Sequence, residues 1–224
     1  MNRIEQLYSD LSRLGRETEM MDTVIRMLAD DLMEATTAEG NSRQVVLSRV
    51  VEGGFDLAAL LGDRLQLPHA APDAEDAAEE DIRVRFRRSH LAFTAAAAHL
   101  TSLSPDVTIE YRGLQLNPGD VVPQRIGEIV LAHDALGTAW TIEEADPDSA
   151  LDALEAMMRR MRNTEEVPAL LLETQEGDRW EFGTNGQHVF GDRENLAQWL
   201  AWGIPGELES EAALPKLPTL LRWT

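Results

Sequence analysis

The residues best placed for chemistry lie in the segment from Arg125 to Leu136, where Glu128 and His133 stand among apolar residues. The apolar spacing predicts a helix packed inside a bundle, with Glu128 pointing into it. At about 100° per residue, His133 lies roughly 140° around this helix from Glu128, so the two side chains cannot share one metal ion. The segment therefore offers a single inward carboxylate, and His133 is interpreted as a hydrogen-bonded structural residue.

No other familiar catalytic motif occurs in the chain. The sequence lacks the GxxxxGK[ST] phosphate loop and the GxGxxG, HExxH and GxSxG patterns. Its histidines show no pair at helical ligand spacing; they are His69, His90, His99, His133 and His188. The absence of cysteine excludes disulfides, a thiol nucleophile and thiolate ligands, so any thiol chemistry would need a cofactor.

The charge balance restricts the partners. Forty acidic residues against 20 basic ones give a net charge of -20, which repels phosphate backbones and anionic lipid. Nucleic acid and membranes are therefore not expected as partners, and a cytoplasmic protein is expected because no signal peptide or spanning segment is recognised. A basic cluster at Arg83, Arg85, Arg87 and Arg88 could hold an anionic ligand, although pairing with nearby acids is the commoner arrangement.

Apolar residues recur every three or four positions through most of the first 162 residues, which predicts the helices that must position Glu128. These helices are expected at 2–33, 42–63 with Ser42 as N-cap, 80–100, 123–140 and 147–161. The stretch 67–80 is expected to be an acidic connection. Alternation in 105–118 favours a strand or an extended loop.

Beyond residue 163 the apolar period changes from helical to alternating. Residues 169–173 and 179–183 flank a turn and predict a hairpin, His188 to Phe190 adds a third strand, and Gly191 opens a last helix. The chain is therefore predicted to be α+β and mainly α, with a helical domain at 1–162 and a small α+β domain at 163–224.

Two of these helices carry a resemblance to a known family. One contains Arg125-x-x-Glu128, and the other begins Gly40-Asn-Ser-Arg43 and reaches Arg49. They resemble segments of the mycothiol-dependent maleylpyruvate isomerases of the DinB-like superfamily, which read roughly Arg-x-x-Glu-x-x-x-His and Gly-Trp-Thr/Ser-Arg-x-x-x-x-Ala-His and bind a divalent metal. Glu128 is retained here, whereas Arg49 and Ala132 stand at the two histidine positions. Because neither replacement ligates metal, the resemblance implies a degenerate site and no bound metal.

The end of the chain also resembles this family. Leu214 to Pro218 followed by Arg222-Trp223 is similar to the Pro-rich close of its small C-terminal domain, but Gly203-Ile204 stands where an arginine thought to serve the active site is expected. The resemblance implies a DinB-like antiparallel four-helix bundle followed by that small domain.

Three functions are compatible with these features. The first is a non-catalytic family member that binds a small molecule or a protein partner without cofactor. The alternative is a mycothiol-dependent isomerase or thiol transferase acting at the bundle cavity, with zinc as the divalent metal. A third is an oligomerisation role, based on apolar tail residues at positions 217, 220, 221 and 223. A monomer or a homodimer is expected.

The sharpest prediction concerns Glu128. Arg49 lies on the inward line of its helix and is predicted to replace the lost metal as the cation facing Glu128. The alternative is that Arg49 extends to solvent and Glu128 pairs with Arg125, three residues earlier. If a metal were bound after all, Asp56 and one of the histidines would be the first additional ligands to suspect.

Overall fold

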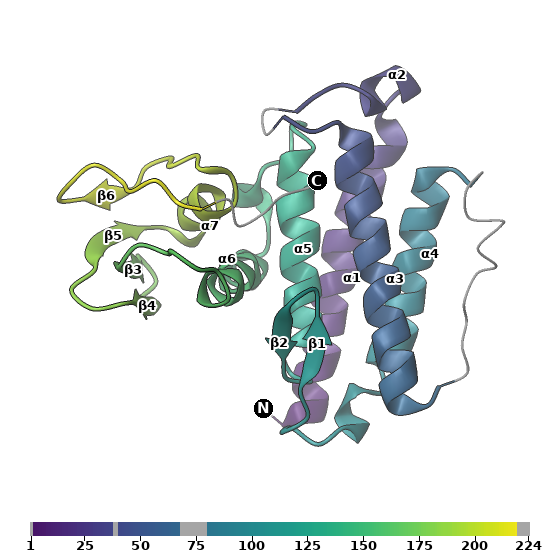
Figure 1. The fold of residues 1–224 in the computed structure, drawn as a ribbon. Coiled ribbons are helices and arrows are strands. Elements are labelled where there is room, and N and C mark those ends of the chain that lie inside the picture. Colours follow the sequence, from purple (N-terminus) through teal and green to yellow (C-terminus); the bar gives the residue numbers. More distant parts are fainter. Residues whose placement is uncertain (1, 38–39, 68–79, 219–224) are drawn as a thin grey trace.

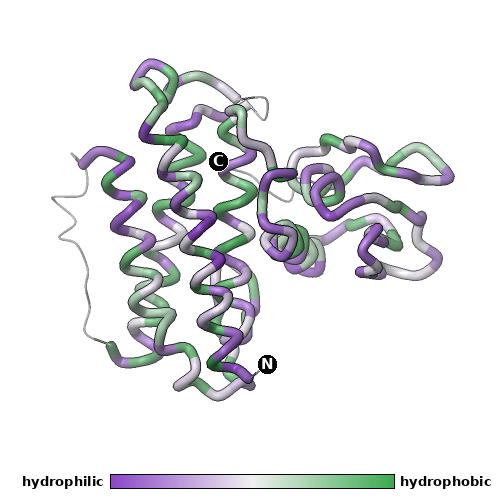
Figure 2. Tube along the Cα trace, turned by 180° about the vertical axis from the view of Figure 1, so that it is seen from behind, coloured by the Kyte–Doolittle hydropathy of each residue, from purple (hydrophilic) through white to green (hydrophobic). Residues whose placement is uncertain are grey.

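The computed structural model describes residues 2–37, 40–67 and 80–218, and its larger part is a four-helix bundle (Figure 1). The bundle helices are α1 (Arg3–Met27), α3 (Arg43–Leu65), α4 (Ile82–Ala97) and α5 (Val121–Ala135). Figure 2 shows hydrophilic and hydrophobic residues interspersed along each of them, as expected for helices that bury one face. Ser42 caps α3 by accepting a hydrogen bond from the backbone N–H of Val45 at 3.3 Å, which confirms the predicted N-cap.

Three helices end earlier than predicted; α4 (Ile82–Ala97) does so by only three residues, and the other two differ more. The single helix expected at 2–33 stops at Met27, and a separate short helix α2 follows at Asp30–Met33. The Arg83 side chain binds the carbonyl oxygen of Leu28 at 2.8 Å, and this residue has left the helical conformation. Helix α5 ends at Ala135 instead of near position 140, because Gly137 adopts a positive φ of 59° that terminates it.

Arginine contacts at the helix ends establish the directions of the bundle helices. Arg43 at the start of α3 binds the carbonyl oxygen of Leu136, just after α5, at 2.6 Å, so α3 and α5 are antiparallel. Arg83 at the start of α4 reaches the end of α1, so these two helices are also antiparallel. Figure 1 shows α3 and α4 running in the same direction, and the connection predicted at 67–80 joins them in the sequence. Residues 68–79 of that connection lie outside the described residues.

A hairpin of β1 (Ile109–Tyr111) and β2 (Leu114–Leu116) precedes α5 and confirms the predicted extended segment. Its two turn residues, Arg112 and Gly113, have positive φ angles of 49° and 79°, as a two-residue hairpin turn of the favoured twist requires. Burial alternates along both strands, so Ile109 and Tyr111 face the core. The hairpin thereby directs Tyr111 toward α5.

The second part of the chain is a small α+β unit. Strands β3 (Leu170–Thr174) and β4 (Arg179–Phe182) form the predicted hairpin, and β5 (Gln187–Gly191) pairs parallel to β3. Helix α7 (Arg193–Trp202) and the short strand β6 (Glu209–Ser210) complete it, with sheet order β4-β3-β5-β6.

Helix α6 (Pro147–Arg162) connects the two parts, because it packs against α5 on one side and α7 on the other. A single hydrophobic cluster runs from the bundle into the sheet and α7. The fold is thus α+β and mainly α, as predicted, while the division into domains 1–162 and 163–224 stays a prediction. Two 3₁₀ turns lie at Leu100–Ser102 and Ile142–Glu144. None of the helices in the described ranges has the length and apolar character needed to span a membrane.

Candidate functional site

Glu128 lies in the bundle between α3 and α5, with both of its carboxylate oxygens engaged. The Tyr111 hydroxyl donates to Oε2 at 3.1 Å, Arg125 Nη1 meets the same oxygen at 3.3 Å, and Gln124 Nε2 donates to Oε1 at 3.4 Å. The Glu128 side chain keeps only 12% of its surface exposed, and that of Arg125 only 1%. Burial, together with the neighbouring carboxylate, raises the pKa of Tyr111, so its hydroxyl stays a donor.

Two adjacent glycines of α3 make room for Arg125. A Cβ at Gly53 would lie 2.8 Å from the Tyr111 hydroxyl oxygen and 3.2 Å from Glu128 Oε2. A Cβ at Gly54 would lie 2.9 Å from Arg125 Nη2 and 3.0 Å from the Ser89 Cβ. The guanidinium therefore occupies space that any side chain at these two positions would fill. Arg125 Nη2 is buried and donates no hydrogen bond to a described residue.

The structure corrects the predicted ion pair. Glu128 pairs with Arg125, and no ion pair joins it to Arg49 within the described ranges. The physical reason lies in the register of the helices, since Gly53, one turn beyond Arg49, is the α3 residue opposite the carboxylate. Arg125 stands three residues before Glu128 on the same helix and reaches it without crossing the bundle. Arg49 itself is half-buried.

The residues around Glu128 do not form a metal ligand set. Ala132, one turn further along α5, is fully buried and carries no donor atom. Asp56 is exposed and bound by Arg112 at 2.8 Å, so it is already paired. Across the described ranges, no three His, Cys, Asp or Glu side chains converge in a way that could hold a metal ion.

His133 is buried and His90 is half-buried, and both have structural environments, although His133 forms no hydrogen bond with a described residue, contrary to expectation. His133 stacks on the Trp140 indole with the ring centroids 3.8 Å apart and the planes 3° from parallel. Burial lowers the pKa of His133 to about 3, so the ring is neutral. His90 contacts the Thr18 hydroxyl through Nδ1 at 3.2 Å, and burial, together with the charge of Arg125, lowers its pKa to about 4. Among the residues that the structure describes, neither ring pairs with a carboxylate of the kind that often orients a catalytic histidine.

The basic cluster on α4 is largely neutralised by acidic neighbours. Arg83 pairs with Asp30 at 3.0 Å, and Arg88 pairs with Glu80 at 2.7 Å. Arg87 lies 3.5 Å from Asp22 of α1. These pairs favour the expected pairing with nearby acidic residues over the anion-site interpretation.

Sequence reasoning missed two polar residues of this site, Gln124 and Tyr111. Gln124 is fully buried and links Glu128 to Arg159 of α6, whose Nη1 binds the Gln124 Oε1 at 3.3 Å. The sequence places Tyr111 only on an alternating strand. Its inward direction follows from that alternation, but the position of the hairpin against α5 depends on tertiary packing, which has no local signal.

The chain is a mainly α protein of the α+β class, with a four-helix bundle, an appended α+β unit and a hydrogen-bonded carboxylate inside the bundle. The same architecture occurs in the crystal structures of the mycothiol-dependent maleylpyruvate isomerase and of a point mutant of it, with TM-scores of 0.73 and 0.74. Each match covers 98% of this chain and 100% of the other, at 14% sequence identity. No protein-family model matches the chain, and no curated protein matches its sequence. The fold implied by the sequence resemblance is thus confirmed.

Proposed function

We propose that this chain is a metal-independent, non-catalytic member of the isomerase fold that binds a small molecule or a protein partner. The observation that carries the proposal is the state of Glu128, whose oxygens accept bonds from three neighbours, while Arg49 and Ala132 stand at the two positions where the related isomerases are expected to have histidines. A carboxylate engaged in this way has little capacity left for a cation.

The charges around Glu128 support the same proposal. Arg125 brings one positive charge to one carboxylate, so the pair is neutral without a metal. A divalent ion beside the guanidinium would have to overcome like-charge repulsion in a site with few exposed atoms. The half-buried Arg49 adds a second cation on the adjacent helix.

The alternative is a mycothiol-dependent isomerase or thiol transferase. It is supported by the likeness in fold and by the retention of Glu128. Because the chain has no cysteine, the thiol would have to come from the cofactor. The described residues beside Glu128 do not fit a metal, so a metal-activated thiolate has no support from their donor atoms.

An activity assay with a restored ligand set tests the proposal. Purified chain, supplied with mycothiol and maleylpyruvate in the presence and absence of Zn²⁺, should show no isomerisation above the uncatalysed rate. Turnover that depends on Glu128 in the wild-type chain would overturn the proposal. The double variant Arg49→His with Ala132→His serves as the comparison. Positions 49 and 132 lie on the antiparallel helices α3 and α5. Both fall between two contacts that join these helices, Arg43 with Leu136 and Gly53 with Glu128.

A further inference from the structure

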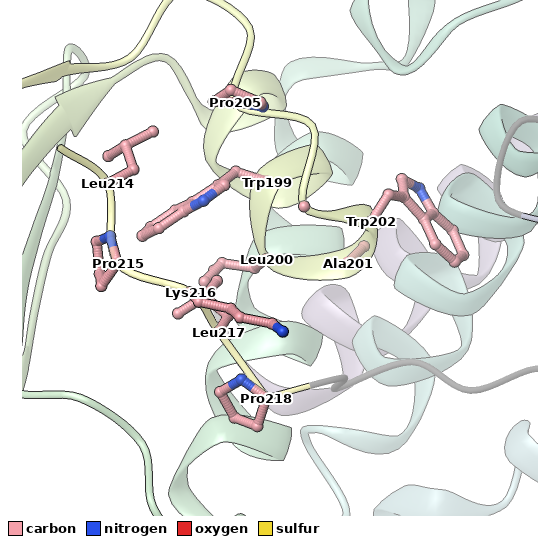
Figure 3. A pocket seen from close by; sticks show the side chains of 11 residues that line it. Trp199, Leu200, Ala201, Trp202, Pro205, Leu214, Pro215, Lys216, Leu217 and Pro218 are labelled. Carbon is pink, nitrogen blue, oxygen red and sulfur yellow. The ribbon is translucent and has the colours of Figure 1, made fainter.

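A pocket of about 360 Å³ lies between α7 and the C-terminal segment that follows β6 (Figure 3). One wall is the α7 face that carries Trp199, Leu200 and Trp202, and the other is the segment from Leu214 to Pro218. The volume falls within the range of about 300 to 1,000 Å³ that is typical of small-molecule sites. The pocket is distant in sequence from Glu128 and uses none of its partners.

The segment that closes the pocket is held in place. Gln187 of β5 donates from Nε2 to the Ser210 hydroxyl at 2.8 Å and to the carbonyl oxygens of Ala212 and Ala213 at 3.2 and 3.1 Å. Strand β6 also pairs with β5 just before this point. The chain is therefore anchored immediately before Leu214, and the pocket is formed in advance of any ligand.

The lining combines aromatic, aliphatic and proline side chains with a single charge. Lys216 is the only lysine in a chain of 224 residues, and no acidic residue lines the pocket although the chain has 40 of them. Figure 3 shows its side chain extending below Leu200 and Ala201 in the view. In the described part of the chain, Lys216 forms no ion pair and donates no hydrogen bond. An uncommitted ammonium beside an apolar lining is suited to an amphiphilic anion.

We propose that this pocket binds a small planar monoanion, an aromatic carboxylate whose apolar body contacts Leu214 and the prolines while the carboxylate meets the Lys216 ammonium. This inference rests on the proposed function and specifies the class of small molecule that the chain binds. The pocket does not involve Glu128, so the test of anion binding and the test of metal binding at Glu128 have independent outcomes. A cationic ligand would be repelled by Lys216, and the net charge of -20 opposes a dianion more strongly than a monoanion.

A charge series on one ring system tests the proposal with the full chain. The probes are 2-naphthoate, the neutral 2-naphthamide and the cationic 2-naphthylmethylammonium, titrated by isothermal calorimetry at pH 7 and moderate salt. We expect 2-naphthoate to bind with a Kd of about 0.1 to 1 mM and the other two at least several-fold more weakly. Lys216→Gln should weaken 2-naphthoate by about 5- to 10-fold and leave 2-naphthamide unchanged.

The control is Arg179→Gln, which makes the same change in net charge at an exposed position of β4 and should leave the affinity unchanged. Urea unfolding of Lys216→Gln shows whether the lysine has a merely structural role, such as complementing the C-terminal end of α7. Absence of 2-naphthoate binding up to 5 mM would overturn the proposal, as would equal binding of all three probes. A loss of affinity that Arg179→Gln reproduces would also overturn it.

Discussion

Replacing Arg125 by Met should destabilise the chain far more than the same change at Arg49. Arg125 is almost completely buried and supplies the cation for Glu128, whereas Arg49 is half-buried and has no ion pair with Glu128 among the described residues. Removing one partner of a buried ion pair costs about 3 to 5 kcal/mol. Two neutral donors, the Tyr111 hydroxyl and the Gln124 amide, remain on Glu128 after the substitution. The expected loss for Arg125→Met is therefore about 2 to 3 kcal/mol, and for Arg49→Met less than about 1 kcal/mol.

The assay is equilibrium unfolding in urea at pH 7, followed by far-UV circular dichroism and by tryptophan fluorescence. The double variant Arg125→Met with Glu128→Gln should recover at least about 1 kcal/mol relative to the sum of the single losses, because the second change removes the uncompensated carboxylate. Equal losses at Arg49 and Arg125, or strictly additive behaviour of Arg125 and Glu128, would refute the assignment of the pair.

Three further predictions concern packing and pH. Gly54→Ala should lower the free energy of unfolding by about 1 to 3 kcal/mol, because its Cβ would lie 2.9 Å from Arg125 Nη2. The control Gly62→Ala lies on the same helix, and its Cβ would meet nothing within 4 Å, so it should stabilise the chain by up to about 1 kcal/mol. Urea unfolding midpoints measure both changes. Burial raises the pKa of Asp152, and the Arg13 guanidinium, 2.7 Å from its Oδ2, opposes part of this rise. Because the folded chain then holds its proton more tightly than the unfolded chain, stability should fall as pH rises above about 4, and Asp152→Asn should lessen that fall in urea unfolding followed across pH. Burial lowers the pKa of His133 to about 3, so stability should be lost as pH falls below about 6.5, where the unfolded chain takes up a proton. His133→Phe keeps the ring stack on Trp140 and should lessen this loss of stability at acid pH, as measured by thermal melts. An unchanged dependence of the melting temperature on pH below about 6.5 would contradict the assignment.

The helices were predictable because their signals are local. The apolar period and the Ser42 cap located α3 to within two residues of its observed end, and the change of period after residue 163 located the β3–β4 hairpin. The errors fell at helix ends, where a distant side chain decides the outcome. Arg83 of α4 donates a hydrogen bond to the carbonyl oxygen of Leu28, the residue after α1, and no pattern within residues 2–33 indicates this contact.

The candidate site was predictable in part. The direction of Glu128 followed from the apolar pattern of α5, but the choice between Arg49 and Arg125 depended on which α3 residues lie opposite the carboxylate. Those residues are Gly53 and Gly54, and consecutive glycines in a helix could have been recognised as a close approach. Gln124 and Tyr111 gave no such signal, since each lies on an element whose pattern describes burial and not the identity of its neighbours.

Zinc binding to the purified chain tests the central claim most directly. After removal of loosely held metal, elemental analysis should find less than about 0.1 zinc per chain, and titration with Zn²⁺ should give no saturable site that depends on Glu128. Weak binding at surface carboxylates would persist unchanged in Glu128→Ala, so that variant separates the two kinds of site. Close to one zinc per chain in the wild type, lost in Glu128→Ala, would contradict the account.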